Sequence, residues 1–294
     1  MRKLTLLVTT PRVAPGLMTR AAWHALEAAD RVAASSDHPL ARAVVASGLA
    51  VERAEDPFAL DGRVVWLASD EEATTLPQRI ATEIVSGDGP EVEVLHASYD
   101  VPGARLLDLV TVMDRLRREC PWDQEQTHRS LATYLLEEAY ETLDAIESGD
   151  GTHLREELGD LLLQVYFHAR IAAEDPEHGF TIDDVAGGIV DKLVYRHPHV
   201  FAGLEVSGAE EVNTNWETLK AAEKKRSSPL EGIPLALPAL ALADKVLGRM
   251  QVDPPPSDGI GERLLALVAE SRRAGVDPEQ ALRDAVRRLT ASAD

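Results

Sequence analysis

The spacing of apolar residues changes near residue 100. Before this point, short apolar runs predict buried strands over residues 4–9, 64–68 and 92–95. Between them, apolar residues at helical spacing predict helices over 17–29 and 76–85. Strands that alternate with helices indicate a small α/β domain with a parallel sheet, which we place at residues 1–100.

From Gly103 onward the spacing is that of helices. Helices are predicted over residues 106–118, 127–148, 153–174, 181–197, 209–225 and 239–250, followed by a final helical pair. Cys120-Pro121-Trp122-Asp123 breaks the first helix, and Thr127 or Ser130 can cap the second. The chain is therefore expected to be mainly α, with a helical domain over 103–228 and a helical C-terminal region over 229–294.

Two acidic clusters lie within the second and third helices of this part. Each contains two carboxylates three residues apart, Glu138 with Glu141 and Glu157 with Asp160. Residues at this spacing project from the same helix face, with Cβ atoms roughly 5–6 Å apart. If the helices are neighbours, four carboxylates converge, and their repulsion favours a hard divalent cation between them.

These acids also occupy positions where apolar residues are expected. Glu138 and Glu141 fall on the stripe that Leu131 and Ala145 define, and Glu157 and Asp160 are flanked by apolar residues in the same way. Buried carboxylates must be paired or bound to a metal because their desolvation is costly. Oxygen ligands suit Mg²⁺ or Mn²⁺, whereas Zn²⁺ prefers His or Cys.

The alternative is that acidic residues on these helices are solvated surface groups. We expect this of Glu137 and Glu156, which are turned away from the stripes. Three histidines near the clusters, His128, His153 and His168, are interpreted as packing or surface groups.

Basic residues at helical spacing follow downstream. Lys192 and Arg196 are four residues apart on the fourth helix, and Trp216 and Lys220 repeat the spacing on the fifth. A lone Lys–Arg pair is usually a solvated face. Beside a carboxylate metal site it becomes a clamp for a polyphosphate, because cations and metal together neutralise phosphoryl oxygens.

The order of these motifs is similar to that of a known family. The motifs are Cys120-Pro121-Trp122-Asp123, Gln126-Thr127-His128 and the segments 134–141, 156–162, 192–193 and 196–201. Over residues 103–250 the chain resembles the MazG family, nucleoside triphosphate pyrophosphohydrolases of the all-α NTP pyrophosphatase superfamily. The resemblance implies a helical bundle that forms a homodimer to complete its active site, and Mg²⁺-dependent hydrolysis of a nucleoside triphosphate to monophosphate and pyrophosphate.

The resemblance also implies roles for individual residues. It assigns the metal to Glu138, Glu141, Glu157 and Asp160, phosphate contacts to Lys192 and Arg196, and further substrate contacts to Trp216 and Lys220. In the expected reaction a metal-activated water attacks the α-phosphorus in line. Lys192 and Arg196 then absorb charge on the leaving pyrophosphate, and one glutamate of the cluster acts as base.

The two ends of the chain are harder to interpret. The first hundred residues faintly resemble the start of a tetrapyrrole methylase domain, but Thr10-Pro11-Arg12-Val13 stands where a glycine-rich turn is expected. We interpret this segment as a remnant or packing module without a methyl-donor site. The segment 261–267 is similar to 159–165, so residues 229–294 are a candidate degenerate second MazG copy that lacks the acidic ligands.

The composition of the chain limits the class of protein and the cellular compartment that we expect. A formal charge of −20 argues against a nucleic-acid binder, which needs a basic face. The single cysteine, Cys120, fits a reducing compartment. With no signal peptide and no apolar run of the ~20 residues needed to span a bilayer, we expect a cytoplasmic protein without a membrane partner.

Three rival functions remain. One is a catalytically weak regulator that binds nucleotides or a protein through the same fold. The second is a narrower enzyme of the superfamily, specific for one pyrimidine triphosphate or a phosphoribosyl-nucleotide, which the Pro121-Trp122-Asp123 block disfavours. The third is a helical scaffold, which leaves the buried carboxylates unexplained. The main hypothesis is an enzyme that removes nucleoside triphosphates from the nucleotide pool.

Overall fold

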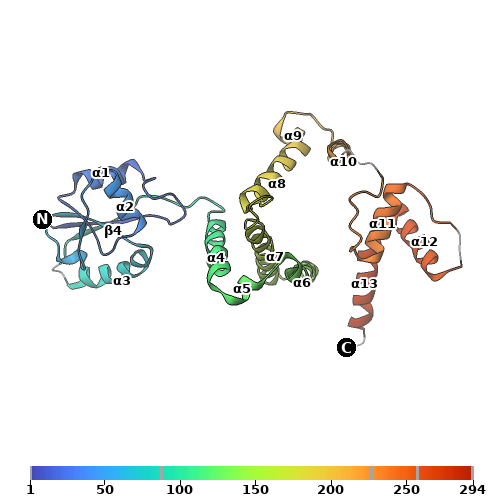
Figure 1. Ribbon diagram of the computed structural model, residues 1–294, viewed down its shortest axis with the longest axis horizontal. Coiled ribbons are helices and arrows are strands. Elements are labelled where there is room, and N and C mark those ends of the chain that lie inside the picture. Colours follow the sequence, from blue (N-terminus) through green and yellow to red (C-terminus); the bar gives the residue numbers. More distant parts are fainter. Residues whose placement is uncertain (1, 87–88, 225–227, 256–257, 293–294) are drawn as a thin grey trace. The chain divides into compact units, whose positions relative to one another are not determined.

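The computed structural model describes residues 2–86, 89–224, 228–255 and 258–292. Its internal contacts divide the chain into two units, Met1–Ala186 and Gly187–Asp294, and each unit is described by itself. The first unit contains the sheet and the helices α1 to α7, and the helices after α8 belong to the second unit (Figure 1).

The first unit begins with a sheet of five strands that all run parallel, in the order β3-β2-β4-β1-β5. The strands are β1 (Lys3–Val8), β2 (Arg31–Ala34), β3 (Glu52–Arg53), β4 (Arg63–Leu67) and β5 (Glu91–His96). The predicted alternation of strands and helices with a parallel sheet is therefore confirmed. Strands β2 and β3 were not predicted, because four and two residues are too short to show the two-residue period of a strand.

Helices cover both faces of this sheet (Figure 1). They are α1 (Arg20–Ala28), α2 (Pro39–Ala46), the 3-10 turn η1 (Pro57–Ala59) and α3 (Asp70–Ser86). Successive side chains of a strand point to opposite faces. Leu7 of β1 accordingly packs with Leu26 of α1, whereas Leu6 packs on the other face with Leu76 of α3.

The remainder of the first unit is helical. It comprises α4 (Arg105–Glu119), α5 (Pro121–Glu125), α6 (His128–Ser148) and α7 (Gly151–Ala172). Met113 of α4, Leu131 of α6 and Phe167 of α7 are buried together in one core cluster. The segment after α4, expected only as a break, starts the short helix α5 because Pro121 is well suited to the first position of a helix.

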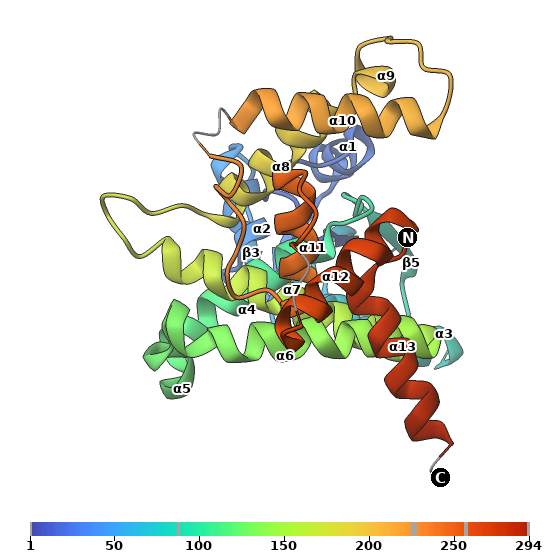
Figure 2. The ribbon, with the colours of Figure 1, turned by 90° about the vertical axis from the view of Figure 1, so that its right-hand side faces the viewer.

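The second unit contains helices only, within the residues described. They are the end of α8 (Ile182–Arg196), then α9 (Pro198–Phe201), α10 (Ala209–Lys224), α11 (Ala239–Met250), α12 (Ile260–Arg273) and α13 (Pro278–Ala291). Leu247 of α11 and Val268 of α12 form a small core of their own, in the helix group drawn orange to red in Figure 2. Lys225 of the predicted fifth helix lies outside the described residues. No described helix is both long and apolar enough to cross a membrane.

Candidate functional site

The helices α6 and α7 form a hairpin that carries both acidic clusters. Thr127 caps α6 and exchanges hydrogen bonds with Ser130, so the two residues considered as caps act together. Gly149 ends the helix in the left-handed conformation with φ of 73°. Asp150 then starts α7 by accepting hydrogen bonds from the backbone N–H groups of Thr152 and His153. This tight turn makes α7 fold back along α6.

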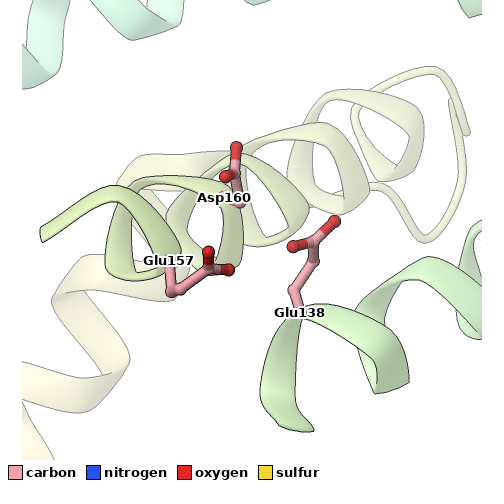
Figure 3. A group of neighbouring side chains, drawn as sticks. All are labelled: Glu138, Glu157 and Asp160. Atoms are coloured by element: carbon pink, nitrogen blue, oxygen red, sulfur yellow. The ribbon is translucent and has the colours of Figure 1, made fainter. Parts of the chain in front are cut away.

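Three carboxylates meet between the two helices. Oxygen atoms of Glu138, Glu157 and Asp160 all lie within 4.8 Å of one another. Figure 3 shows Glu138 extending from α6 toward α7, from which Glu157 and Asp160 extend in turn. The structure therefore brings together three of the four carboxylates that the sequence singled out.

Burial differs among the four acids. Glu157 is 8% exposed, Glu138 and Asp160 are half-buried, and Glu141 is exposed. Glu141 lies at the edge of the buried stripe because three residues advance about 300° around a helix, which leaves it about 60° from Glu138. The expected exposure of Glu137 and Glu156 is observed.

Glu138 lies in a field that opposes its ionisation. Burial raises the pKa of Glu138, and the charges of Asp160 and Glu141 raise it further, together with a hydrogen bond to Glu141 and the charge of Glu157. Each of these causes disfavours the carboxylate form. A cation placed among the three oxygens would remove the repulsion.

Thr142 connects the two helices directly behind the carboxylates. Its side-chain hydroxyl donates to the backbone carbonyl of Glu138 at 2.8 Å and lies 3.4 Å from the carbonyl of Glu157. Thr142 and Ala145 are both buried, so α6 and α7 approach closely at this level. The acids thus project from rigid helices held in fixed register.

The donor set fits a hard divalent cation. All three clustered side chains supply oxygen, the ligand type that Mg²⁺ and Mn²⁺ take in proteins, and no histidine or cysteine belongs to the group. A histidine lies next to the group, since His153 Nε2 is 3.1 Å from Glu157 Oε1. A single half-exposed imidazole cannot balance three carboxylates, so the cluster retains excess negative charge.

Several known proteins are similar in sequence to this chain. Residues 126–201 match the family model described as the MazG nucleotide pyrophosphohydrolase domain. An uncharacterized 26.1 kDa protein of Streptomyces cacaoi is 53% identical over 67% of this chain and 85% of its own length. The nucleoside triphosphate pyrophosphohydrolase of Mycolicibacterium smegmatis is 47% identical over 76% of this chain, which spans just under two thirds of that relative (66%).

One further relative shows to which family the chain belongs. The nucleoside triphosphate pyrophosphohydrolase of Escherichia coli K12 is 43% identical over 58% of this chain and 68% of its own length. The chain belongs to the MazG family. Since this is a family of nucleotide pyrophosphohydrolases, the chain is a hydrolase. The matched segment of this MazG protein runs from just before α6 to the end of α9, and so contains both acidic clusters, Lys192 and Arg196.

The basic candidates of the MazG protein lie in its second unit. Arg196 is 5% exposed, and its Nε and Nη2 donate to Glu223 Oε2 at 3.0 and 2.7 Å. Its guanidinium also lies over the ring of Trp216, 5.1 Å from the centroid. Lys220 Nζ donates to Glu217 at 2.7 Å, and Lys192 is exposed. The structure thus brings Arg196 and Trp216 together.

The Cys120-Pro121-Trp122-Asp123 motif has a packing role. Trp122 contacts Tyr134 edge-on and Phe167 at a tilt, with ring centroids 6.1 and 6.4 Å apart. Arg117 of α4 donates to the carbonyl of Asp123 and forms two hydrogen bonds with Glu174 after α7, at 2.8 and 2.9 Å. These contacts fix the turn from which α6 starts.

Three residues near these groups were not predicted to act there. Thr142 was not singled out, His153 was interpreted as a packing or surface group, and Glu223 was not considered. The His153–Glu157 pair has i, i+4 spacing and could have been found from the sequence. The Arg196–Glu223 pair could not, because its partners are 27 residues apart on different helices.

Proposed function

We propose that this protein hydrolyses nucleoside triphosphates to monophosphate and pyrophosphate, with Mg²⁺ or Mn²⁺ bound by Glu138, Glu157, Asp160 and Glu141. The observation that carries the proposal is the cluster of three carboxylates within 4.8 Å, one of them 8% exposed. The names of the relatives from Mycolicibacterium smegmatis and Escherichia coli support the substrate class. We expect the protein to act in the cytoplasm and to remove nucleotides from the cellular pool.

Different residues of the protein have different roles in the proposed hydrolysis. A bound divalent cation supplies Lewis-acid polarisation of phosphoryl oxygens and acidifies water. The helices α6 and α7 hold the carboxylates in place, so little reorganisation is needed when charge develops during reaction. Of the four proposed ligands, we assign the role of base to Glu141, which is exposed beside Glu138 and would accept a proton at the carboxylate oxygen left free of the metal.

We assign phosphate binding to Lys192 and Arg196, and further substrate contacts to Trp216 and Lys220. A guanidinium binds a carboxylate and a phosphate through the same donors. Arg196, which now donates to Glu223, would therefore exchange this carboxylate for a phosphate when substrate binds.

A homodimer is part of the proposal. The surfaces of α6 and α8 carry large apolar side chains that are exposed in the single chain, namely Leu136, Leu143, Ile146, Ile189, Val190, Leu193 and Val194. Exposed apolar groups at this density favour association with another surface. Light scattering coupled to size exclusion should give twice the monomer mass of 31.9 kDa.

The activity is tested by measuring pyrophosphate release from a panel of NTPs and dNTPs with Mg²⁺, Mn²⁺ or EDTA. We expect metal-dependent release, which Glu157→Gln should lower at least about 100-fold because a buried ligand is lost. Glu156→Gln is the matched control, since Glu156 is exposed on the same helix, and it should retain activity. No turnover of any triphosphate by the folded protein would refute the enzyme and favour the nucleotide-binding regulator.

A further inference from the structure

A concave site lies in the α/β domain, far along the chain from the carboxylates. A cavity of about 440 Å³ opens at the carboxyl edge of the sheet, within the range of roughly 300–1,000 Å³ typical of small-molecule pockets. In open parallel sheets with helices on both faces, this is the edge where ligands bind. The fold therefore provides a binding position that the helical domain does not use.

Hydroxyl groups gather around this cavity from four separate strands. Thr9 and Thr10 follow β1, Ser36 follows β2, Ser69 follows β4 and Ser98 follows β5. Because the strands are parallel, their ends meet at one edge, which brings these side chains together. The backbone N–H of Thr10 donates to Ser98 Oγ at 2.9 Å, so the loops after β1 and β5 are joined.

Two further polar groups line the cavity. The His38 ring bonds the carbonyl of Leu67 through Nε2 at 3.1 Å. Because a carbonyl only accepts, Nε2 is the donor, and the neutral ring then presents Nδ1 as an acceptor. Glu71, exposed in the first turn of α3, adds a carboxylate. Among the described residues no side chain caps the start of α2, which leaves its first-turn N–H groups as donors beside the cavity.

The charge of the cavity restricts what it can bind. Neither lysine nor arginine is present among its described lining residues, and Glu71 is negative. Arg12 lies in the same loop, but its guanidinium is paired with Asp100 at 2.5 Å and with Asp108 at 2.6 Å. A phosphate group would meet repulsion here without a compensating cation. The cavity is also lined by the apolar residues Pro11, Pro15 and Leu17.

We propose that this cavity binds an uncharged nucleoside. The heterocycle would lie against the apolar residues Pro11, Pro15 and Leu17, and its acceptor atoms would face the first-turn N–H groups of α2. The sugar hydroxyls would donate to Glu71 and exchange hydrogen bonds with the serine and threonine side chains. This inference is independent of the hydrolase activity, and it replaces the interpretation of residues 1–100 as a packing module only.

Equilibrium dialysis of the full chain in EDTA provides the test. The probes are radiolabelled adenosine, guanosine, cytidine and uridine, each compared with its 5′-monophosphate. We expect saturable binding of at least one nucleoside. The matching monophosphate should bind at least about tenfold more weakly, because its phosphate is repelled. Glu71→Gln should weaken nucleoside binding about tenfold, since a hydrogen bond to a charged group is lost.

Matched controls separate this site from the rest of the molecule. Glu91→Gln makes the same change at the amino edge of the sheet and should leave binding unchanged. Ala14→Trp fills the cavity from its exposed loop and should abolish binding, whereas Ala50→Trp, before β3, should not. Circular dichroism verifies that each variant is folded.

Three results would each overturn the inference. They are the absence of saturable binding for all four nucleosides, equal binding of the monophosphates, and binding that survives Ala14→Trp in a folded protein. The carboxylate cluster is unchanged in all of these variants, so pyrophosphate release reports on the proposed hydrolase separately.

Discussion

Arg196 shows how the surroundings of one residue bear on its proposed role. Its guanidinium is almost fully buried, paired with Glu223 and placed over Trp216. The guanidinium is therefore held in position before any substrate binds, but the carboxylate of Glu223 competes with the phosphate of the substrate for its N–H donors. Phosphate and Glu223 would occupy the same donors.

Glu223→Gln should strengthen substrate binding. The neutral amide holds the guanidinium less firmly, so phosphate competes with a weaker partner, and we expect KM for a nucleoside triphosphate to fall about threefold to tenfold. Glu217→Gln, which alters the partner of Lys220 instead, serves as a comparison. A rise in KM would show that Glu223 positions Arg196 and does not compete with phosphate.

Glu174 gives a prediction about pH. A hydrogen bond from Arg117 lowers the pKa of Glu174 below its ordinary value of 4.5, and the charges of Arg117 and Arg170 lower it further. A carboxyl whose pKa is lower in the folded state stabilises the fold above its unfolded pKa. The stabilisation is lost as the pH falls through the folded value.

Glu174→Gln should therefore lower the free energy of unfolding by about 1 kcal/mol at neutral pH, a figure reduced because the side chain is 42% exposed. The difference from the unmutated protein should shrink as the pH falls below 4.5 and through the lowered folded pKa of Glu174, because the carboxyl then becomes protonated in both states. Urea unfolding at several pH values measures it, with Glu177→Gln as the control. A difference that does not change with pH would contradict the ion-pair explanation.

At the scale of elements, the hairpin of α6 and α7 decides where the acids meet. Its turn consists of Gly149 and Asp150, one in the left-handed conformation and the other capping α7. A longer or looser turn would let the helices slide and would separate Glu138 from Glu157. The register is also held by the hydroxyl of Thr142.

Gly149→Ala isolates the contribution of this turn. No atom lies within 4 Å of the added Cβ, so the cost comes from the backbone at φ of 73° and should be about 1 kcal/mol of unfolding free energy. Gly149→Asn should cost less, because asparagine tolerates this conformation. Thermal unfolding of the three proteins measures the order, and equal losses for Ala and Asn would contradict it.

At the scale of the whole molecule, folding places like charges together in a chain that already carries a net charge of −20. The hairpin can form only if other contacts outweigh the repulsion within the carboxylate cluster. A ligand that binds the folded state and neutralises the cluster shifts the folding equilibrium by mass action.

Mg²⁺ or Mn²⁺ should therefore raise the melting temperature. At a concentration 100 times the dissociation constant, the stabilisation is about 2.7 kcal/mol for one site. Differential scanning calorimetry with Mn²⁺ or with EDTA measures the shift, and K⁺ at matched ionic strength controls for screening. Glu157→Gln should remove most of the shift while Glu156→Gln keeps it. An equal shift in both variants would place the metal elsewhere.

Helix positions and acid spacing were already determined by the local sequence. The periodicity of residues 106–118 and 239–250 predicted α4 and α11 almost to the residue, because a helix depends on contacts within a few positions. The spacing of Glu138 with Glu141 and of Glu157 with Asp160 predicted that four carboxylates meet on neighbouring helices, and the hairpin brings three of them together. Short strands such as β3 escaped prediction because they are stabilised by pairing with β2, a contact between distant residues.

Only the tertiary structure decided how these local elements act on one another. It exposed Glu141 while burying Glu157, paired Arg196 with Glu223, and joined the hydroxyls after four strands around one cavity. The reason is physical. Helix periodicity fixes the direction of a side chain on its own element, whereas burial, charge pairing and cavities depend on which distant elements pack against it.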